Sequence, residues 1–290
     1  MRLLPLSPRR YSRAALREAR TRLRPWVLAG AVENTGAAEA PVPGSTYADL
    51  YEEHATALPP DASIGDGDFD VIGRVELAIL TEAGLTPSSS LVDFGCGTGR
   101  LAVHAVPFLS RGAYHGTDIA PTMLRHAAAL LADRLGSVPA HARLSVQPDE
   151  QFPVLLGPPD MFAAFSVFTH MEHEDICRYL RGARAVSAAH TVFVASCLEL
   201  ELPEGRHIFE MSAVKTLDER WREVRNVVTS RDLFTAVAAV AGWTVTAWHG
   251  GDGPAGTMPD GSRVGLGQSV VVMRPSAREL RDELHPSVSA

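Results

Sequence analysis

The sequence predicts an α/β protein whose helices cover both faces of a mostly parallel sheet. Short apolar runs alternate with segments of helical periodicity over roughly residues 69–198. This alternation is typical of strand–helix–strand units, whose parallel strands are buried on both faces. Polar side chains also stand at the ends of several predicted strands, and such sheets bind ligands at those carboxyl ends. The pattern therefore predicts a fold class and the edge of the sheet where a site would lie.

The individual elements follow from local signals along the chain. A short helix is expected at 47–54, and apolar residues recur at helical spacing from Phe69 or Asp70 until Gly84, which predicts a second helix. The next elements, in chain order, are a strand at 91–94, a helix at about 99–110, a strand at 113–117, a helix at 121–135, strands at 143–147 and 161–166, a helix at 172–187 and a strand at 191–198.

The last third of the chain continues this pattern less regularly. Residues 199–216 are expected to form a loop over the site, followed by a helical segment at 217–225. Ser230 is the predicted N-cap of a further helix, because its hydroxyl can accept a hydrogen bond from a free backbone N–H. Two final strands are expected at 243–248 and 268–273, with a glycine-rich stretch between them.

Length and composition predict one substantial core with an extension. The chain has 290 residues and 46% hydrophobic content, without an apolar run approaching the roughly 18–20 residues that cross a bilayer. Its first residues are too proline-broken for a secretory signal. The 3 cysteines are odd in number and lack metal-ligand spacing, so neither a disulfide framework nor a metal site is expected. We expect a cytoplasmic protein.

The charge is distributed unevenly. Residues 1–30 carry eight arginines and one acidic residue, which leaves a net charge of −14 for the remainder. An acidic body does not favour a face that grips phosphate backbones, so neither nucleic acid nor a membrane is an expected partner. We expect a helix at 12–23 that packs on the domain or on a second copy in a homodimer. Contact with an anionic partner and a transit peptide are the alternatives.

These features suggest three parts. They are a basic N-terminal helix and linker at 1–45, one folded domain at 46–275 and a C-terminal tail at 276–290.

The stretch from Leu91 to Arg100 is the most informative motif. It reads as a buried strand that turns on Gly95, Gly97 and Gly99 into a helix. Glycines let the backbone pass close to a ligand, and a helix beginning near Arg100 would direct free N–H groups at it. Nicotinamide and flavin enzymes use a related G-x-G-x-x-G turn, but here Arg100 stands where that pattern requires Gly or Ala.

An acid precedes this turn, and Asp93-x-Gly95-x-Gly97-x-Gly99 resembles motif I of the class I S-adenosylmethionine-dependent methyltransferases. A second strand at 114–118 also ends in an acid, and residues 160–170 look like the family's fourth strand. The resemblance covers roughly residues 46–275. It implies a Rossmann-like, seven-stranded sheet with an antiparallel last strand, a transferase activity, and S-adenosyl-L-methionine as cofactor.

The resemblance also implies roles for individual residues. The glycines and Asp93 would border the methionine end and the ribose of the cofactor. Asp118 would hold both ribose hydroxyls, because a carboxylate accepts two parallel hydrogen bonds; capping the following helix is its alternative role. The adenine would lie beside the start of that helix, with Gln147 or Asp149 near its amino group. The expected cofactor-binding residues are Asp93, Gly95, Cys96, Gly97, Gly99, Asp118, Ile119, Met123 and Ser166.

His170 is the candidate catalytic residue. It follows the fourth strand at the mouth of the expected site, and the reference pKa of histidine, about 6.5, suits proton removal at neutral pH. Alternatively, Thr169 or His170 only begins the helix that follows, and His173 could replace His170 as the base. The neighbouring Glu172 and Glu174 superficially resemble a metal cluster, but a solvated helix start is the expected explanation.

The predicted function is methyl transfer to a small molecule, most of all O-methylation of a metabolite or sugar. The donor's methyl group is already activated, so the protein has to align the acceptor and exclude water. N-methylation, another reaction of the same cofactor, a cofactor-binding protein without turnover and a nicotinamide oxidoreductase are the alternatives. Residues 166–169 lack the Asn/Asp-Pro-Pro motif of amino-directed nucleic-acid methylases, which argues against that substrate class.

Acceptor-pocket residues are harder to assign. The expected loop at 199–216 contains the candidates His207, Phe209 and Glu210, and the aromatic residues Tyr47, Tyr51 and Phe69 could form a lid. Each of these residues could equally serve ordinary packing, as aromatic residues at helical spacing commonly do.

Overall fold

The computed structural model describes residues 47–57, 59, 68–152, 157–221 and 224–277. The predicted basic helix at 12–23, the linker at 31–46 and most of the C-terminal tail lie outside these residues, as does any homodimer contact through that helix. Within the described part of the chain, no helix is both long and apolar enough to cross a bilayer.

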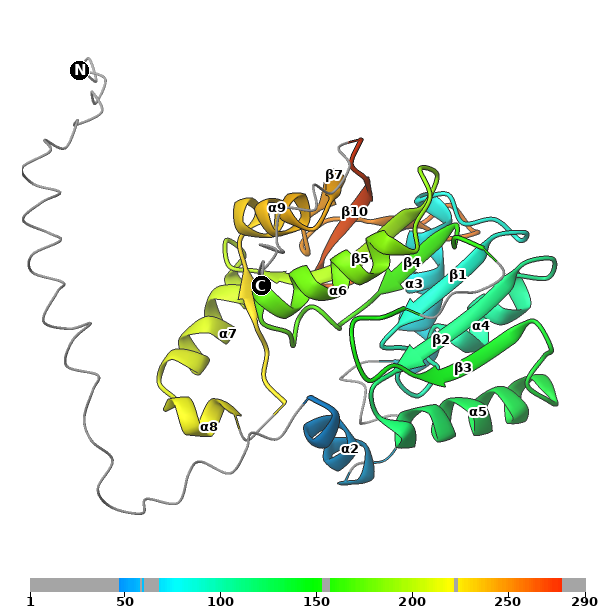
Figure 1. Ribbon diagram of the computed structural model, residues 1–290, viewed down its shortest axis with the longest axis horizontal. Helices are drawn as coiled ribbons and strands as arrows, with labels where there is room; N and C mark the ends of the chain where they lie inside the picture. The colour runs from blue at the N-terminus through cyan, green and yellow to red at the C-terminus, as the bar shows by residue number, and fades with distance from the viewer. Residues whose placement is uncertain (1–46, 58, 60–67, 153–156, 222–223, 278–290) are drawn as a thin grey trace, which may run out of the picture. The chain divides into compact units, whose positions relative to one another are not determined.

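A twisted central sheet organises the described chain (Figure 1). Its main path runs β3-β2-β1-β4-β5-β10-β7, and a two-residue strand, β6, pairs with β5 as an eighth member. The strands are β1 (Ser90–Phe94), β2 (Ala113–Asp118), β3 (Ala142–Val146), β4 (Met161–Ala164), β5 (Val192–Glu199), β6 (Val228–Thr229), β7 (Trp243–His249) and β10 (Ser269–Pro275). β10 is antiparallel to both β5 and β7, whereas the other pairs are parallel. The predicted seven-stranded sheet with an antiparallel last strand is confirmed.

Helices cover both faces of this sheet, so the doubly wound architecture is also confirmed. One face carries α3 (Phe69–Glu82), α4 (Ala102–Phe108) and α5 (Pro121–Leu135), and the other carries α6 (His173–Ala185) and α9 (Arg231–Val240). Successive side chains of a strand therefore face opposite sides of the sheet. In β1, Leu91 packs in one hydrophobic core and Val92 in the other. Parallel strands buried on both faces remove apolar surface from water on each side, which is the main stabilising contribution.

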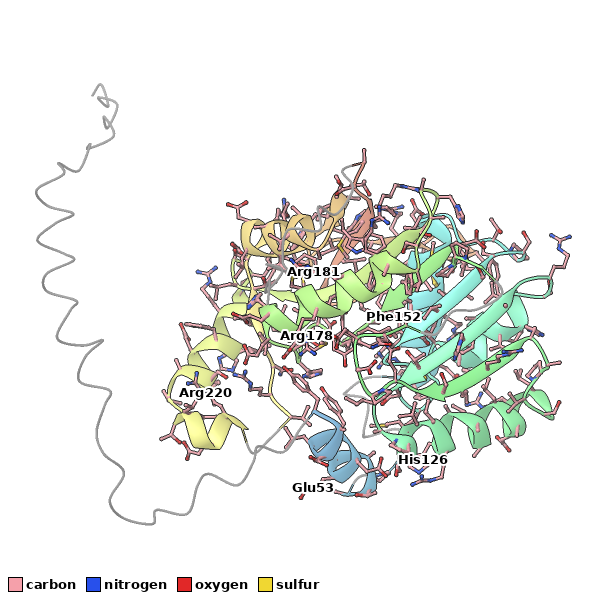
Figure 2. All side chains as sticks on the ribbon, in the orientation of Figure 1. Glu53, His126, Phe152, Arg178, Arg181 and Arg220 are labelled. Atoms are coloured by element: carbon pink, nitrogen blue, oxygen red, sulfur yellow. The ribbon has the colours of Figure 1, made fainter. Side chains whose placement is uncertain are left out.

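The helix α6 shows how one element separates core from solvent. Ile176, Leu180 and Ala183 on its inner face are buried against the second core, where Phe152 packs edge-on against Phe162. Arg178, by contrast, has a side chain that is 57% exposed. Figure 2 shows Arg178 on α6 and Phe152 between that helix and the strands. The helix is therefore amphipathic in the way that its sequence spacing requires.

Three further helices gather beyond the carboxyl ends of the parallel strands (Figure 1). They are α2 (Tyr47–Ala57), α7 (Pro203–Ala213) and α8 (Leu217–Trp221). A small hairpin, β8 (Gly256–Thr257) with β9 (Arg263–Val264), lies in the glycine-rich stretch and contacts α3. The carboxyl edge of the sheet is thus covered by elements from both the beginning and the end of the domain.

The predicted loop at 199–216 was wrong, because most of it forms α7. Leu202 takes the extended N-cap conformation and Pro203 stands in the first turn, where its fixed backbone angle suits a helix start. Glu204 follows in the same turn and complements the positive end of the helix. The predicted helical segment at 217–225 is described as helix from Leu217 to Trp221.

Two predicted helix starts were also early, by one to three residues. α4 begins at Ala102 instead of near Arg100, because Gly99 has φ +93°, which no right-handed helix can contain. α6 begins at His173, because Glu172 has the extended backbone of an N-cap residue, with ψ 150°. The other predicted elements lie within about three residues of the observed ones, and Ser230 caps α9 by accepting from the Leu233 N–H at 3.1 Å.

Candidate donor and acceptor cavity

A cavity of about 760 Å³ opens at the carboxyl ends of β1, β2 and β4. This volume lies within the range of small-molecule sites. Its wall is shared by the glycine turn after β1, the ends of β2 and β4, the helices α2 and α7, and the segment that precedes β10. The convergence at this edge agrees with the general position of ligand sites in open α/β sheets.

The glycine turn depends on the absence of side chains. Gly95 has φ +71°, and a Cβ there would stand 2.4 Å from a Val167 methyl carbon. Gly99 has φ +93°, and a Cβ there would meet the Ala127 backbone and side chain at 3.3 Å. A larger residue would therefore be both strained and displaced at either position. The turn brings Cys96 and Gly97 to the cavity wall.

Asp118 ties this turn to the second strand. Its Oδ2 accepts a hydrogen bond from the Gly97 N–H at 2.9 Å, and its Oδ1 accepts from the Ala120 N–H at 2.9 Å. Ala120 is the N-cap residue of α5, so part of the alternative capping role is present. The side chain still lines the cavity, and its oxygens retain lone pairs for further donors. Burial raises the pKa of Asp118 to about 6, against the lowering effect of these backbone donors.

Asp93 lies deeper, at the floor of the cavity, and is only 3% exposed. Its Oδ2 accepts a hydrogen bond from the Tyr114 hydroxyl at 2.6 Å. Burial raises the pKa of Asp93 to about 7, while the Tyr114 hydrogen bond and Arg100 act to lower it. A buried ion pair between Arg100 and Glu76 borders the same wall, with 2.6 Å between Nη2 and Oε1.

Sequence reasoning missed Glu76 and Arg100 as members of this wall, and it missed Tyr114 as the buried partner of Asp93. Glu76 carried a readable signal, because it is an acid in the apolar stripe of α3 and is 1% exposed. A buried carboxylate requires a partner, and the only arginine inside the glycine motif supplies it. Tyr114 had no such signal, because apolar runs commonly contain tyrosine.

The polar wall beyond β3 contains an unsatisfied group. Gln147 is 3% exposed and lines the cavity, and its Nε2 donates to the Asp149 carbonyl at 3.3 Å. Among the described residues, the buried Oε1 of Gln147 has no hydrogen-bond partner. A buried acceptor without a partner costs free energy, so this atom favours a ligand that presents an N–H. Ile119 and Met123 line the same part, whereas Asp149 does not.

A second polar cluster stands at the exit of β4. Ser166 has φ +56°, unusual for a residue with a side chain, and its N–H donates to Ser196 Oγ at 2.7 Å. Gln268 Nε2 donates to Ser166 Oγ at 3.0 Å, and Ser196 Oγ donates to Gln268 Oε1 at 2.6 Å. Three distant segments are thus joined at the cavity wall. Gln268 was not predicted, because only the observed register of β10 brings it there.

His170 lies in the cavity wall beside the helix α2. Its Nδ1 is 2.9 Å from the Arg225 carbonyl oxygen. A carbonyl only accepts hydrogen bonds, so Nδ1 carries the proton and Nε2 keeps its lone pair in the neutral ring. Burial lowers the pKa of His170, which keeps the ring neutral at pH 7. His173, the alternative base, is the first residue of α6 and does not line the cavity.

The outer part of the cavity is formed by helices instead of strand ends. Tyr47, Tyr51 and His54 of α2 line it, whereas Phe69 packs against the hydrophobic core instead of serving as a lid residue. The Tyr47 hydroxyl accepts from the Glu172 N–H and donates to Asp175 Oδ2, both at 3.1 Å. These two bonds join α2 to the start of α6.

The helix α7 supplies a different set of residues from the predicted one. Glu204 and Ile208 line the cavity, one helical turn apart. His207, Phe209 and Glu210 are exposed and do not line it. The expectation for those three was wrong because a helix directs adjacent residues to different sides, whereas a loop imposes no such spacing.

Comparisons with known proteins agree with this geometry. Residues 92–193 match a family model described as a methyltransferase domain. Magnesium protoporphyrin IX methyltransferase from Synechocystis PCC 6803 is 14% identical with a TM-score of 0.55, over 79% of this chain and 97% of that one. The CcbJ methyltransferase from Streptomyces caelestis is 17% identical with a TM-score of 0.53, over 80% and 98%.

The mitomycin 7-O-methyltransferase MmcR is also similar, at 17% identity and a TM-score of 0.53, over 72% of this chain. The chain spans only 54% of the length of that protein. At these identities the structural likeness shows the fold alone.

The sheet order, the acid-flanked glycine turn and the matched domain together define a Rossmann-like methyltransferase. Residues 92–193 are a methyltransferase domain, and the fold of the described chain is that of the class I S-adenosylmethionine-dependent methyltransferases, which use S-adenosyl-L-methionine as cofactor. The antiparallel β10 between β5 and β7 differs from the 3-2-1-4-5-6 strand order of the mostly parallel sheet that binds dinucleotides.

Proposed function

We propose that this enzyme transfers the methyl group of S-adenosylmethionine to an oxygen atom of a small molecule, a metabolite or a sugar. The observation that carries the proposal is a neutral imidazole, His170, in the same cavity as the glycine turn and its two carboxylates. The cavity is walled by α2 and α7, which suits an enclosed small acceptor better than a polymer.

The residues around the inner half of the cavity, which is formed by the strand ends and the glycine turn, suit the cofactor. Asp118 would accept hydrogen bonds from the ribose hydroxyls on its remaining lone pairs. Gln147 Oε1, a buried acceptor without a partner in the described part of the chain, would accept a hydrogen bond from the adenine amino group. Asp93 would lie at the methionine end, Ile119 and Met123 would contact the base, and the remaining proposed contacts are Gly95, Cys96, Gly97, Gly99 and Ser166.

When bound there, the cofactor supplies a methyl group that is already activated as a sulfonium substituent. The chain's own residues then have two tasks, which are to align the acceptor and to manage its proton. His170 would take the acceptor's hydroxyl proton on Nε2, while its Nδ1–H bond to the Arg225 carbonyl fixes the tautomer. The Tyr51 ring lies edge-on to the His170 ring, with 6.2 Å between the ring centroids, and would help to exclude water.

Two names among the similar structures support a small acceptor. Magnesium protoporphyrin IX and mitomycin, the compounds in those names, are both small molecules. We further propose the division into a basic arm at 1–45, a catalytic domain at 46–275 and a tail at 276–290. We also propose a cytoplasmic location, because free thiols suit a reducing compartment and the three cysteines are all free: Cys96, Cys177 and Cys197.

The test is mass spectrometry of acceptor pools incubated with the full chain and methyl-labelled cofactor. A matched pair of pools, one of small hydroxyl compounds and one of small amines, separates the acceptor atom. Label in hydroxyl compounds that a mild base does not remove is the expected result. Label confined to amines, or to a polymer added as a third pool, would contradict the proposal.

A further inference from the structure

Tyr114 and Asp93 form a buried hydrogen bond between their side chains, which is separate from the backbone hydrogen bonds that pair the strands. Tyr114 is 1% exposed and lies on β2, and its hydroxyl donates to Asp93 Oδ2 across the strand boundary at 2.6 Å. Such a length is typical of an O–H donor bonded to an ionised carboxylate. Burial raises the pKa of Tyr114 well above that of free tyrosine, so its hydroxyl keeps its proton and acts as a donor throughout the working pH range.

The backbone is arranged to permit this contact. In the register of β1 and β2, Leu91 stands opposite Tyr114 and Asp93 opposite Gly116, so Tyr114 and Gly116 share the face that carries Asp93. A Cβ on Gly116 would stand 3.1 Å from the Tyr114 ring and 2.9 Å from the Cys96 sulfur. The missing side chain of Gly116 therefore leaves the space through which the Tyr114 ring reaches the cavity floor.

We infer that Tyr114 is a positioning residue, whose hydroxyl holds the ionised Asp93 carboxylate toward the methionine end of the donor. This inference rests on the proposed role of Asp93. Tyr114 is absent from the cavity wall, so it would act only through Asp93. The donor's methionine end carries an ammonium group, and an ionised carboxylate binds that group more strongly than a neutral acid does.

The other charged and titratable groups around Asp93 set the balance that Tyr114 shifts. Glu76 from α3 and Asp118 from the end of β2 disfavour its ionised form, whereas Arg100 from the glycine turn favours it. The Cys96 thiol also faces Asp93, but burial raises its pKa, so it remains uncharged. Two carboxylates therefore raise the pKa of Asp93 and one guanidinium lowers it. The Tyr114 hydroxyl is the other group that lowers this pKa and so favours the ionised form.

The consequence is a pH-dependent donor affinity. Ligand binding that requires an ionised group weakens as the pH falls through the pKa of that group in the free protein. For Asp93 this pKa is about 7. Removal of the Tyr114 hydroxyl raises it, and affinity is then lost at a higher pH than in the parent protein.

The experiment is calorimetric titration of the full chain with S-adenosylhomocysteine, which keeps the methionine end and is not turned over. The parent protein and Tyr114→Phe are compared from pH 6 to pH 9, and the ratio of their dissociation constants is taken at each pH. This ratio cancels the titration of the ligand's own amine. For a pKa rise of one unit, the ratio is about one at pH 9, about fivefold at pH 7 and about tenfold at pH 6.

The variant Asp93→Asn and the double variant Tyr114→Phe with Asp93→Asn complete the cycle. If Tyr114 acts through Asp93, adding Tyr114→Phe to Asp93→Asn does not change the affinity further. A ratio that is constant with pH, or one that persists without Asp93, overturns the inference. Failure of the parent protein to bind S-adenosylhomocysteine at any pH would instead overturn the proposed role of the cavity.

Site-specific placement of 3-fluorotyrosine at position 114 covers the case in which Tyr114→Phe does not fold. Fluorine makes the hydroxyl a stronger donor and retains the ring, so the low-pH loss of affinity is expected to move to lower pH. A shift to higher pH, or no shift, would contradict the inference. Thermal melting of each protein at pH 7 verifies that the measured samples are folded.

Discussion

The inner and outer halves of the cavity are built in different ways. The inner half uses strand ends and a glycine turn, where Asp93, Asp118 and Gln147 are each less than 9% exposed and are fixed by hydrogen bonds. The outer half uses the helices α2 and α7, whose cavity-lining side chains include the exposed Glu204. We therefore propose that the rigid strand ends hold the donor, while the surface helices hold the acceptor.

The largest expected effect is a loss of kcat on substitution of His170, which lies where the inner and outer halves meet. His170→Gln should lower kcat by about 10²–10⁴, because a positioned base contributes that factor, while the affinity for S-adenosylhomocysteine stays within about twofold of the parent. Burial lowers the pKa of His170, so the kcat of the parent protein at saturating donor should be constant above pH 7 and should fall below about pH 6.5 as the ring takes up a proton. That fall should be absent from the variant.

His141→Gln is the matched control, because its Nε2 also bonds a backbone carbonyl, that of Val106 at 3.0 Å, and it lies outside the cavity wall. Steady-state rates of the three proteins across pH 5.5–9 provide the measurement. Equal rates in His170→Gln and His141→Gln would assign His170 to structure and would leave the junction without a base.

The next largest effect is expected in the inner half. Asp118→Ala should weaken the binding of S-adenosylhomocysteine by about 1–3 kcal/mol, since it removes charge-assisted hydrogen bonds to the ribose and releases the Gly97 N–H. Titration calorimetry measures this loss. The control is Asp260→Ala, in an exposed turn where the carboxylate bonds Ser262. Unchanged affinity in Asp118→Ala would remove Asp118 from the donor site.

The outer half can be tested with two adjacent residues of α7. Ile208→Ala should raise the KM for the acceptor by roughly tenfold, because a lost apolar contact in a pocket is worth about 1–3 kcal/mol. Phe209→Ala is the control, since Phe209 is 50% exposed and faces away from the cavity. Steady-state kinetics with the identified acceptor should leave Phe209→Ala unchanged. If Phe209→Ala raised KM instead, the orientation of α7 would be refuted.

The smallest expected effect concerns the unpartnered acceptor in the inner half. Gln147→Leu should weaken S-adenosylhomocysteine binding by about 0.5–1.5 kcal/mol, the usual contribution of one hydrogen bond. Because the Gln147 Oε1 has no partner among the described residues, and the Nε2 makes one long bond of 3.3 Å to the Asp149 carbonyl, the same change should lower the melting temperature of the free protein only slightly. Gln151→Leu, in the exposed segment that follows, is the control. Tighter binding by Gln147→Leu would exclude an N–H donor at this position.

The sequence was informative where a backbone constraint and a side chain had to coincide. Gly95 and Asp118 could be predicted, because a turn with positive φ angles and an acid at a strand end follow from local patterns. Gln268 could not, because its place depends on the pairing of β10 with β5, 72 residues from Ser196 in the chain. Tyr114 could not, because its function depends on the space that Gly116 leaves.

The acceptor side was predicted less well for a similar reason. α7 occupies a stretch whose mixture of glycine, proline and polar residues predicts a loop, and a loop assignment does not identify the side chains that share one helical face. Pro203 is the local signal for the start of this helix. The general lesson is that strand ends can be predicted from short motifs, whereas a covering helix has to be placed before its residues can be assigned.

The most direct measurement is a crystal structure of the full chain with bound S-adenosylhomocysteine. The account predicts the ribose hydroxyls on Asp118, the adenine amino group at Gln147 Oε1, and the sulfur facing the part of the cavity that His170 borders. A ligand bound elsewhere, or a cavity left empty at saturating concentration, would contradict the account.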